Sequence, residues 1–301
     1  MRRPQLSDWL ILAGLVVAWG SSFFMTKIAV THIDPVWVMA LRLAIAGVFL
    51  LVFALVSGYS MPREPKLWGW FAWLGLIGNA APFFLISWGT QFVTSGLSGV
   101  LMGAVPLMVI VLAHLLLPDE RLNFMKSAGF AVGFAGLLIV LGIDRVSGFS
   151  GESSALAGEL AILLACLCYS VHGIFARWIP YSQPVEQSVA VCLCGAVIGL
   201  VFAMIGAPSG PVSDEPLAYL AVAGLGILPT GIASVLVYRL LRSCGVSFVA
   251  YSNYLVPVFA LAFGAVSLGE PLTWNAGAGL ALILAGIAVS RMRWLSKETV
   301  T

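Results

Sequence analysis

The stretch VPLMVIVLAHLLLPDERL at residues 105–122 recurs as VPVFALAFGAVSLGEPLT at residues 256–273, and this repetition decides the fold. In each copy a proline stands second in an apolar run, and a glutamate follows just after the run ends. Pro106 therefore corresponds to Pro257, about 150 residues further along the chain. Self-similarity at a fixed offset indicates a repeat architecture, so we expect two similar halves.

The composition indicates an integral membrane protein. Of 301 residues, 60% are hydrophobic and 9% are charged, whereas about a quarter of the residues of a soluble domain are charged. A transmembrane helix takes about 20 residues, so ten spans would use most of the chain and leave short connections. We therefore expect the lipid bilayer to surround the protein, and nucleic acid is not an expected partner.

Ten apolar runs are long enough to cross a bilayer, and turn residues such as Gly, Pro and Asp separate them. A helix satisfies the hydrogen bonds of its own backbone inside hydrocarbon. The sequence therefore predicts an all-α membrane protein with ten transmembrane helices. The predicted spans are residues 9–30, 35–56, 67–91, 95–117, 124–143, 155–178, 184–205, 216–240, 246–268 and 274–291.

The repeat divides these spans into two sets of five, and we expect the halves to be residues 9–143 and 155–293. Because five is odd, the second half must enter the membrane from the side opposite to the first. The result is a 5+5 inverted repeat. Two halves related in this way can exchange conformations and open a shared site to alternate sides, which is the geometry of a transporter.

The distribution of lysine and arginine predicts the orientation. With ten spans and a cytoplasmic amino terminus, only Lys27 and Arg145 fall on the outer side, and Arg42 falls inside a span. This asymmetry is typical of a bacterial-type inner-membrane protein with both termini in the cytoplasm. The residues on the cytoplasmic side are Arg2, Arg3, Arg63, Lys66, Arg121, Lys126, Arg177, Arg239, Arg242, Arg291, Arg293 and Lys297.

Two further segments join the repeated ones in resembling a known family: LVVAWGSSFFMTKIAV at residues 15–30 and ALRLAIAG at 40–47. The chain resembles the drug/metabolite transporter superfamily, specifically its ten-helix members with two EamA domains. The resemblance covers nearly the whole chain. It implies a 5+5 inverted fold, a central cavity lined mainly by spans 1, 3, 4, 6, 8 and 9, and export of amino acids or related metabolites, without naming a substrate.

The chain also departs from the pattern of its relatives. Small four-helix relatives that expel cationic drugs carry a glutamate shortly before the glycine of the first span, where this chain has Val17. Their proton-exchange mechanism is therefore not implied here. The halves differ as well: Tyr169 stands where the first half has Trp19, and Cys192 lies near the counterpart of Arg42.

Two charged residues inside predicted spans are candidate functional groups, because charge in hydrocarbon is costly. Arg42 could attract a carboxylate, but a structural cation that bonds neighbouring carbonyls is the reading we favour. Glu159 is a candidate for proton or cation coupling, although an acid in the first turn of a helix also stabilises the helix dipole.

Prolines and polar or aromatic residues near mid-membrane complete the candidate site. A cavity for a small metabolite needs apolar walls with a few polar anchors, and prolines inside helices create bends. We expect Pro82, Pro106, Pro229 and Pro257 to act as gating hinges. The expected substrate-binding residues are Trp19, Asn79, Trp88, Gln91, Tyr169, His172, Tyr238, Tyr251 and Asn253.

The resulting hypothesis is a transporter, not an enzyme, that exports a small molecule, works as a monomer and uses no cofactor or metal. The cysteine pairs at 166/168 and 192/194 have a spacing that points the two thiols to different helix faces, which disfavours a metal site. Alternatives are a facilitator or importer of a sugar, nucleotide derivative or vitamin, or efflux of cationic drugs. A lipid-modifying enzyme would need catalytic motifs such as HExxH or a nucleophile elbow, which the sequence lacks.

Overall fold

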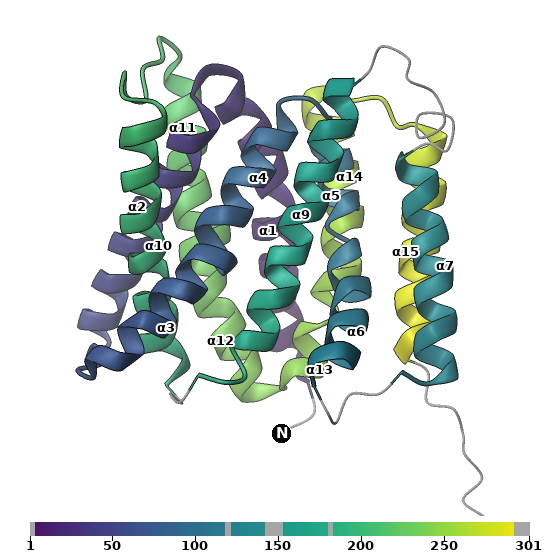
Figure 1. Ribbon diagram of the computed structural model, residues 1–301, viewed down its shortest axis with the longest axis horizontal. Helices are drawn as coiled ribbons and strands as arrows, with labels where there is room; N and C mark the ends of the chain where they lie inside the picture. The colour runs from purple at the N-terminus through teal and green to yellow at the C-terminus, as the bar shows by residue number, and fades with distance from the viewer. Residues whose placement is uncertain (1–3, 118–121, 142–152, 180–182, 292–301) are drawn as a thin grey trace, which may run out of the picture.

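A computed structural model describes residues 4–117, 122–141, 153–179 and 183–291 of the chain. These residues form an all-helical bundle of ten spans, as predicted (Figure 1). The first half comprises α1 (Leu6–His32), α2 (Pro35–Val56), a third span built from α3 (Pro65–Gly75), η1 (Leu76–Ala80) and α4 (Ala81–Thr90), a fourth from α5 (Ser95–Leu101) and α6 (Ala104–Leu116), and α7 (Phe124–Leu141).

The second half repeats this order. It comprises α9 (Ser153–Phe175), α10 (Pro184–Gly206), an eighth span built from α11 (Pro216–Leu225), η2 (Gly226–Ile232) and α12 (Ala233–Ser243), a ninth from α13 (Val246–Val249) and α14 (Ser252–Leu268), and α15 (Trp274–Arg291). Of the ten spans within the described residues, nine contain a helix that is long and apolar enough to cross a membrane. The exception is the span built from α13 and α14, because these are separate helices and α14 alone has 17 residues. The predicted span boundaries agree with these helices to within a few residues.

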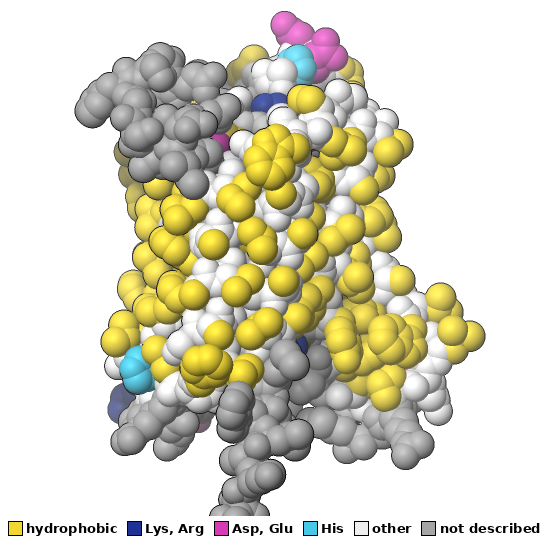
Figure 2. Space-filling view, turned by 90° about the vertical axis from the view of Figure 1, so that its right-hand side faces the viewer, with side chains coloured by type: hydrophobic (Ala, Val, Ile, Leu, Met, Phe, Trp, Pro, Cys, Tyr) yellow, Lys and Arg dark blue, Asp and Glu magenta, His cyan; other side chains and the backbone are white. Residues whose placement is uncertain are grey.

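The two halves start at opposite ends of the bundle. In Figure 1, α1 starts at the lower end and α9 at the upper end, because five spans separate the two starts. The last span, α15, ends at the same lower end at which α1 begins. Hydrophobic side chains cover the middle of the described face in Figure 2, and charged side chains appear near its ends, as expected of a surface in contact with lipid.

Spans 3 and 8 each contain a π-helical segment at the same place in the repeat, η1 and η2. A proline explains each, because it lacks the N–H that the carbonyl four residues earlier needs. Pro82 is the second residue after η1, and Pro229 lies inside η2. In span 8 the hydroxyl of Thr230 replaces the missing donor, since its Oγ1 donates to the Leu225 carbonyl at 2.9 Å.

Spans 4 and 9 are interrupted instead. The break between α5 and α6 lies just before Pro106, and the break between α13 and α14 lies one and a half turns before Pro257. Pro82, Pro106 and Pro229 therefore lie in or beside irregular helix geometry, whereas Pro257 lies inside the regular helix α14.

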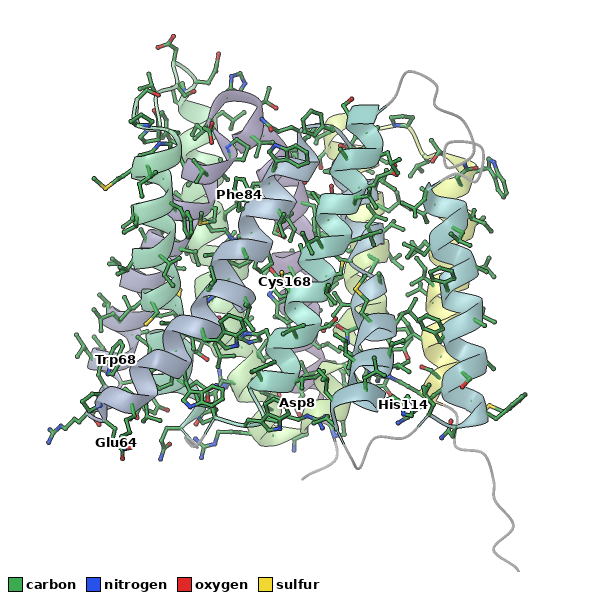
Figure 3. All side chains as sticks on the ribbon, in the orientation of Figure 1. Asp8, Glu64, Trp68, Phe84, His114 and Cys168 are labelled. Atoms are coloured by element: carbon green, nitrogen blue, oxygen red, sulfur yellow. The ribbon has the colours of Figure 1, made fainter. Side chains whose placement is uncertain are left out.

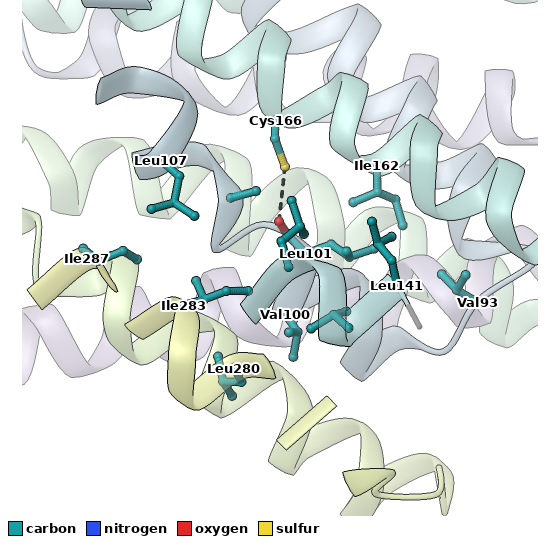
Figure 4. Close-up of a cluster of buried hydrophobic side chains, with 13 residues drawn as sticks. Val93, Val100, Leu101, Leu107, Leu141, Ile162, Cys166, Leu280, Ile283 and Ile287 are labelled. Atoms are coloured by element: carbon teal, nitrogen blue, oxygen red, sulfur yellow. Dashed lines mark hydrogen bonds between the residues drawn. The ribbon is translucent and has the colours of Figure 1, made fainter. Parts of the chain in front are cut away.

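The pair α7 and α15 stands at one edge of the bundle (Figure 1) and packs through glycine. A Cβ added to Gly286 would lie 2.5 Å from the Gly129 carbonyl oxygen and 2.5 Å from the Gly133 amide nitrogen. The two backbones are in direct contact, which only glycine permits. A cluster of buried side chains that includes Leu101, Ile162 and Ile283 joins this pair to α5, α6 and α9 (Figure 4).

At the upper end, two charged residues hold the turn between spans 3 and 4. Lys27 Nζ donates to the carbonyls of Thr90 at 2.8 Å and Val93 at 2.9 Å, at the end of α4. The Glu270 carboxylate accepts hydrogen bonds from the amides of Ser95 at 2.7 Å and Gly96 at 2.9 Å, at the start of α5. The second half thereby caps a helix of the first.

Candidate functional site

A central cavity of about 400 Å³ lies where the two halves meet. Spans 1, 3, 4, 6, 8 and 9 line it, as the family resemblance implied, and span 2 contributes Arg42. At about 30 Å³ per water molecule the space would hold roughly a dozen waters, enough for a small metabolite. The wall consists of Trp19, Ser22, Phe23, Arg42, Gly78, Asn79, Phe83, Ile86, Met102, Val105, Tyr169, Pro229, Thr230, Ser234, Ser252, Asn253, Val256 and Pro257.

The irregular segments of spans 3 and 8 form two sides of this cavity. Gly78 and Asn79 come from η1, and Pro229 and Thr230 from η2. The indole Nε1 of Trp19 donates to the Pro229 carbonyl at 3.1 Å, which ties span 1 of the first half to span 8 of the second. π-Helical turns are frequent at functional sites because they expose backbone groups that a regular helix would use.

Arg42 is the only lysine or arginine among the wall residues, and no aspartate or glutamate is among them. Its side chain is 7% exposed. Nε donates to Thr230 Oγ1 at 2.9 Å, and Cζ lies 3.7 Å from the centroid of the Phe83 ring. The guanidinium therefore lies over an aromatic face, a favourable cation–π arrangement.

Aromatic side chains supply much of the remaining wall. The rings of Phe83 and Tyr169 meet edge to face with their centroids 6.4 Å apart. Trp19 and Tyr169, which occupy equivalent positions in the two repeats, both line the cavity. The cavity thus presents one cation, several neutral polar groups and broad apolar surfaces.

Four of the nine expected substrate-binding residues lie in this wall: Trp19, Asn79, Tyr169 and Asn253. The expected hinges Pro229 and Pro257 also line it, while Pro82 and Pro106 each adjoin a wall residue. The binding roles themselves stay predictions.

The structure places Trp88 and Gln91 elsewhere. Both line a second cavity of about 570 Å³ between α2, α4 and α10, together with Phe84, which Figure 3 labels on the upper part of α4. The physical reason is η1, because a π turn adds a residue and rotates later side chains by about 100° around the helix. A regular helix through span 3 would have aligned these side chains differently.

His172 lies behind the wall. Its ring packs against Gly78, where an added Cβ would come within 2.0 Å of Nδ1. Among the described residues Nδ1 has no hydrogen-bond partner. The imidazole therefore supports the π segment from outside the cavity rather than facing a ligand in it.

Tyr238 and Tyr251 lie toward the lower end, away from the cavity wall. The Tyr238 hydroxyl accepts from Arg242 Nη1 at 3.2 Å and shares a hydrogen bond with Tyr59, which raises the pKa of Tyr59. Tyr251 is 48% exposed and packs beside Trp9. Tyr251 was expected inside a continuous ninth span, but it occupies the break between α13 and α14, which turns its ring outward.

Glu159 is buried, at 1% exposed, and lies in a third cavity of about 410 Å³. Thr94, Thr273 and Asn275 share this cavity. The carboxyl group is therefore close to the upper end of the bundle and separate from the central cavity.

Sequence reasoning missed several wall residues, notably Phe83, Thr230, Ser22 and Ser234. Phe83 and Thr230 each follow a proline that distorts its span. That adjacency was the available signal, since residues beside such a distortion tend to face the space it opens. In the part of the chain that the structure describes, no group of three or more His, Cys, Asp or Glu could hold a metal ion.

Both halves match one family. Residues 7–142 and residues 156–292 each match the model of the EamA-like transporter family. The chain belongs to this family. It is therefore a multi-pass membrane transporter and not an enzyme, and the resemblance read from the sequence is confirmed.

Relatives of the transporter carry the same general description. It is 28% identical over 280 residues to the uncharacterized transporter YoaV of Bacillus subtilis, covering 92% of this chain and 94% of that protein. It is 24% identical over 263 residues to the uncharacterized inner membrane transporter YedA of Escherichia coli, covering 87% and 83%. A solved crystal structure with 24% identity has the same fold, with a TM-score of 0.67 and coverage of 96% and 97%.

Proposed function

We propose that the transporter exports amino acids or related small metabolites across the inner membrane by alternating access. The observation that best supports this is the position of the central cavity, to which both halves contribute wall residues. Since the halves start at opposite ends of the bundle, an exchange of their conformations would open the same cavity to either side.

In this proposal the moving units are the halves at residues 9–143 and 155–293, and one chain is sufficient because it encloses the cavity by itself. Pro82, Pro106, Pro229 and Pro257 act as hinges. The first three lie in or beside an irregular part of a span, and Pro257 lies inside α14. Each proline removes a backbone hydrogen bond that would resist bending.

The first experiment is a growth screen of cells that overproduce the transporter, using toxic amino-acid analogues, dipeptides and cationic drugs. We expect resistance to an amino-acid analogue that is lost in Asn79→Ala and Trp19→Ala. Trp73→Ala is the matched control, because Trp73 is 41% exposed on the lipid-facing surface. Resistance that survives both cavity substitutions would exclude the central cavity as the transport site.

Reconstituted vesicles separate export from its alternatives. Uptake into inside-out vesicles driven by an imposed pH or sodium gradient identifies a coupled exporter, whereas equilibration without a gradient identifies a facilitator. We propose Glu159 as the coupling group, so Glu159→Gln should abolish gradient-driven accumulation and leave substrate exchange intact. Accumulation that persists in Glu159→Gln would remove this residue from the coupling mechanism.

The proposed orientation places both termini in the cytoplasm. It is tested with single cysteines at Ser57, which follows α2 at the lower end, and Ser209, which follows α10 at the upper end, both exposed. In a variant without the native cysteines, a membrane-impermeant thiol reagent should label Ser209→Cys on intact cells and spare Ser57→Cys. The reverse labelling would invert the topology.

A further inference from the structure

Arg42 carries a buried positive charge for which the described residues provide no counter-ion. It lies seven residues into α2, about 10 Å from the start of the helix at 1.5 Å per residue. No acidic side chain lines the cavity, and Arg42 forms no ion pair with a described residue. A cation at this depth is costly unless water or an anion compensates it.

The hydrogen bonds of Arg42 leave one edge of the guanidinium unused. Nε is bonded to Thr230, and one face lies on Phe83. The two terminal nitrogens, Nη1 and Nη2, make no hydrogen bond to the residues described, and neither is shut off from the cavity space. Two parallel N–H groups of this kind match the two oxygens of a carboxylate.

Most other donors in the wall are already committed to backbone carbonyls. Ser22 donates to Trp19 at 2.6 Å, Ser234 to Thr230 at 2.6 Å, and Ser252 to Val249 at 2.7 Å. These side chains stabilise the irregular spans and have no hydrogen left for a ligand. The donors that remain for a bound molecule are the terminal nitrogens of Arg42, the Tyr169 hydroxyl, and the amides of Asn79 and Asn253.

The charge belongs to one half only. The position related to Arg42 by the repeat is Cys192, a buried residue whose Sγ lies 3.9 Å from the Leu43 carbonyl. A single cation near one wall calls for a single anionic group, and the aromatic and aliphatic surfaces of Trp19, Phe23 and Ile86 suit an apolar remainder.

We propose that the central cavity selects small amphiphilic monocarboxylates, with the carboxylate bound by Nη1 and Nη2 of Arg42 and the apolar part against the aromatic walls. The substrate does not need an ammonium group. Such a group can donate to the amide oxygens of Asn79 and Asn253, but no carboxylate in the wall balances its charge. Organic cations are rejected by Arg42. This proposal rests on one part of the proposed function, namely that the central cavity is the transport site.

Binding to the purified full-length protein in detergent tests the proposal directly. The probes are four molecules that share a phenyl group: hydrocinnamate, phenylalanine, hydrocinnamamide and phenethylamine. Isothermal titration should show both carboxylates binding about tenfold or more tightly than the amide and the amine. Neither the amide nor the amine can form the charged, hydrogen-bonded pair with Arg42. Equal binding of all four, no binding preference for the acids, or tighter binding of phenethylamine overturns the proposal.

Variants locate the determinant. Arg42→Gln should lose the preference for carboxylates, and Arg42→Lys should keep part of it, since lysine retains charge without the two-pronged geometry. Arg239→Gln, which changes an exposed arginine on α12, is the control and should bind like the wild type. A folded Arg42→Gln variant with unchanged carboxylate affinity contradicts the proposal.

Two safeguards keep the outcomes separate. If Arg42→Gln does not fold, Thr230→Val and the probe ranking of the wild type decide. Thr230→Val removes the anchor of Nε and the hydroxyl bond to the Leu225 carbonyl but keeps the guanidinium charge, so it should weaken carboxylate binding less than tenfold. Transport is measured independently in reconstituted vesicles. Carboxylate binding without transport refutes the proposed function alone, whereas transport of phenethylamine unaffected by Arg42→Gln refutes the selectivity alone.

Discussion

Replacement of Glu270 by glutamine should destabilise the transporter substantially. The Glu270 carboxylate accepts three hydrogen bonds at the start of α5: from the Ser95 amide at 2.7 Å, the Gly96 amide at 2.9 Å and Ser95 Oγ at 2.9 Å. Glutamine keeps one acceptor oxygen but directs an NH₂ group at an N–H donor. Because Oε2 accepts two of the three bonds, the amide oxygen takes that position, and the NH₂ group faces the Ser95 amide, which loses its acceptor. The two bonds that remain are no longer made to a charged group, so we expect a total cost of about 3 kcal/mol.

The measurement is thermal unfolding of the purified protein in a mild detergent, followed by intrinsic fluorescence. A loss of about 3 kcal/mol corresponds to a melting temperature lowered by roughly 6–12 °C. The matched control is Glu64→Gln. Glu64, labelled at the lower end of Figure 3, also precedes a helix, but it is exposed and its side chain makes no capping bond.

Glu64→Gln should therefore melt with the wild type. If Glu270→Gln also melts with the wild type, the bond between the second half and α5 does not contribute to stability, and the reasoning is refuted. An equal loss in both variants would instead show that acidic charge at a helix start matters, and not the three direct bonds.

Three further predictions concern packing and capping, each measured by the same unfolding assay. Gly286→Ala should destabilise the protein by about 1–3 kcal/mol, because the added Cβ meets the backbone of α7. A Cβ added at Gly277 on the same helix meets nothing within 4 Å, so Gly277→Ala should stabilise the protein slightly. Equal effects of the two substitutions would disprove the close packing. Asp34→Ala should cost about 1 kcal/mol, because Asp34 Oδ1 caps α2 at 2.9 Å, and Asp34→Asn should restore most of it. Trp19→Phe keeps the aromatic surface but leaves the Pro229 carbonyl without its indole donor, so a loss of about 1 kcal/mol is expected; an unchanged melting temperature would show that water takes over this bond.

The number, order and repetition of the spans could be predicted from the sequence. A span is a local property, because about 20 consecutive apolar residues suffice to form one. The correspondence between Pro106 and Pro257 in the repeat can be recognised from the sequence without any contact between the two residues. For the same reason the prolines in the sequence marked the irregular geometry of spans 3 and 8, at Pro82 and Pro229.

The sequence could not determine which side chains face the central cavity. Trp19 and Trp88 are both aromatic residues near mid-membrane, yet only Trp19 reaches the cavity wall. The rotation of each helix decides this, and η1 changes the rotation of everything beyond it in span 3. Thr230 was missed because its importance depends on Arg42, 188 residues away in the chain.

The sequence by itself determined a family, a ten-span topology and a candidate charge inside the second span. The tertiary structure decided what surrounds that charge. From the sequence a structural cation was the favoured reading of Arg42, whereas the structure leaves its terminal nitrogens unbonded within the described residues and beside the cavity. The physical reason is that apolar length is a property of adjacent residues, whereas a binding site is a property of side chains that only folding brings together.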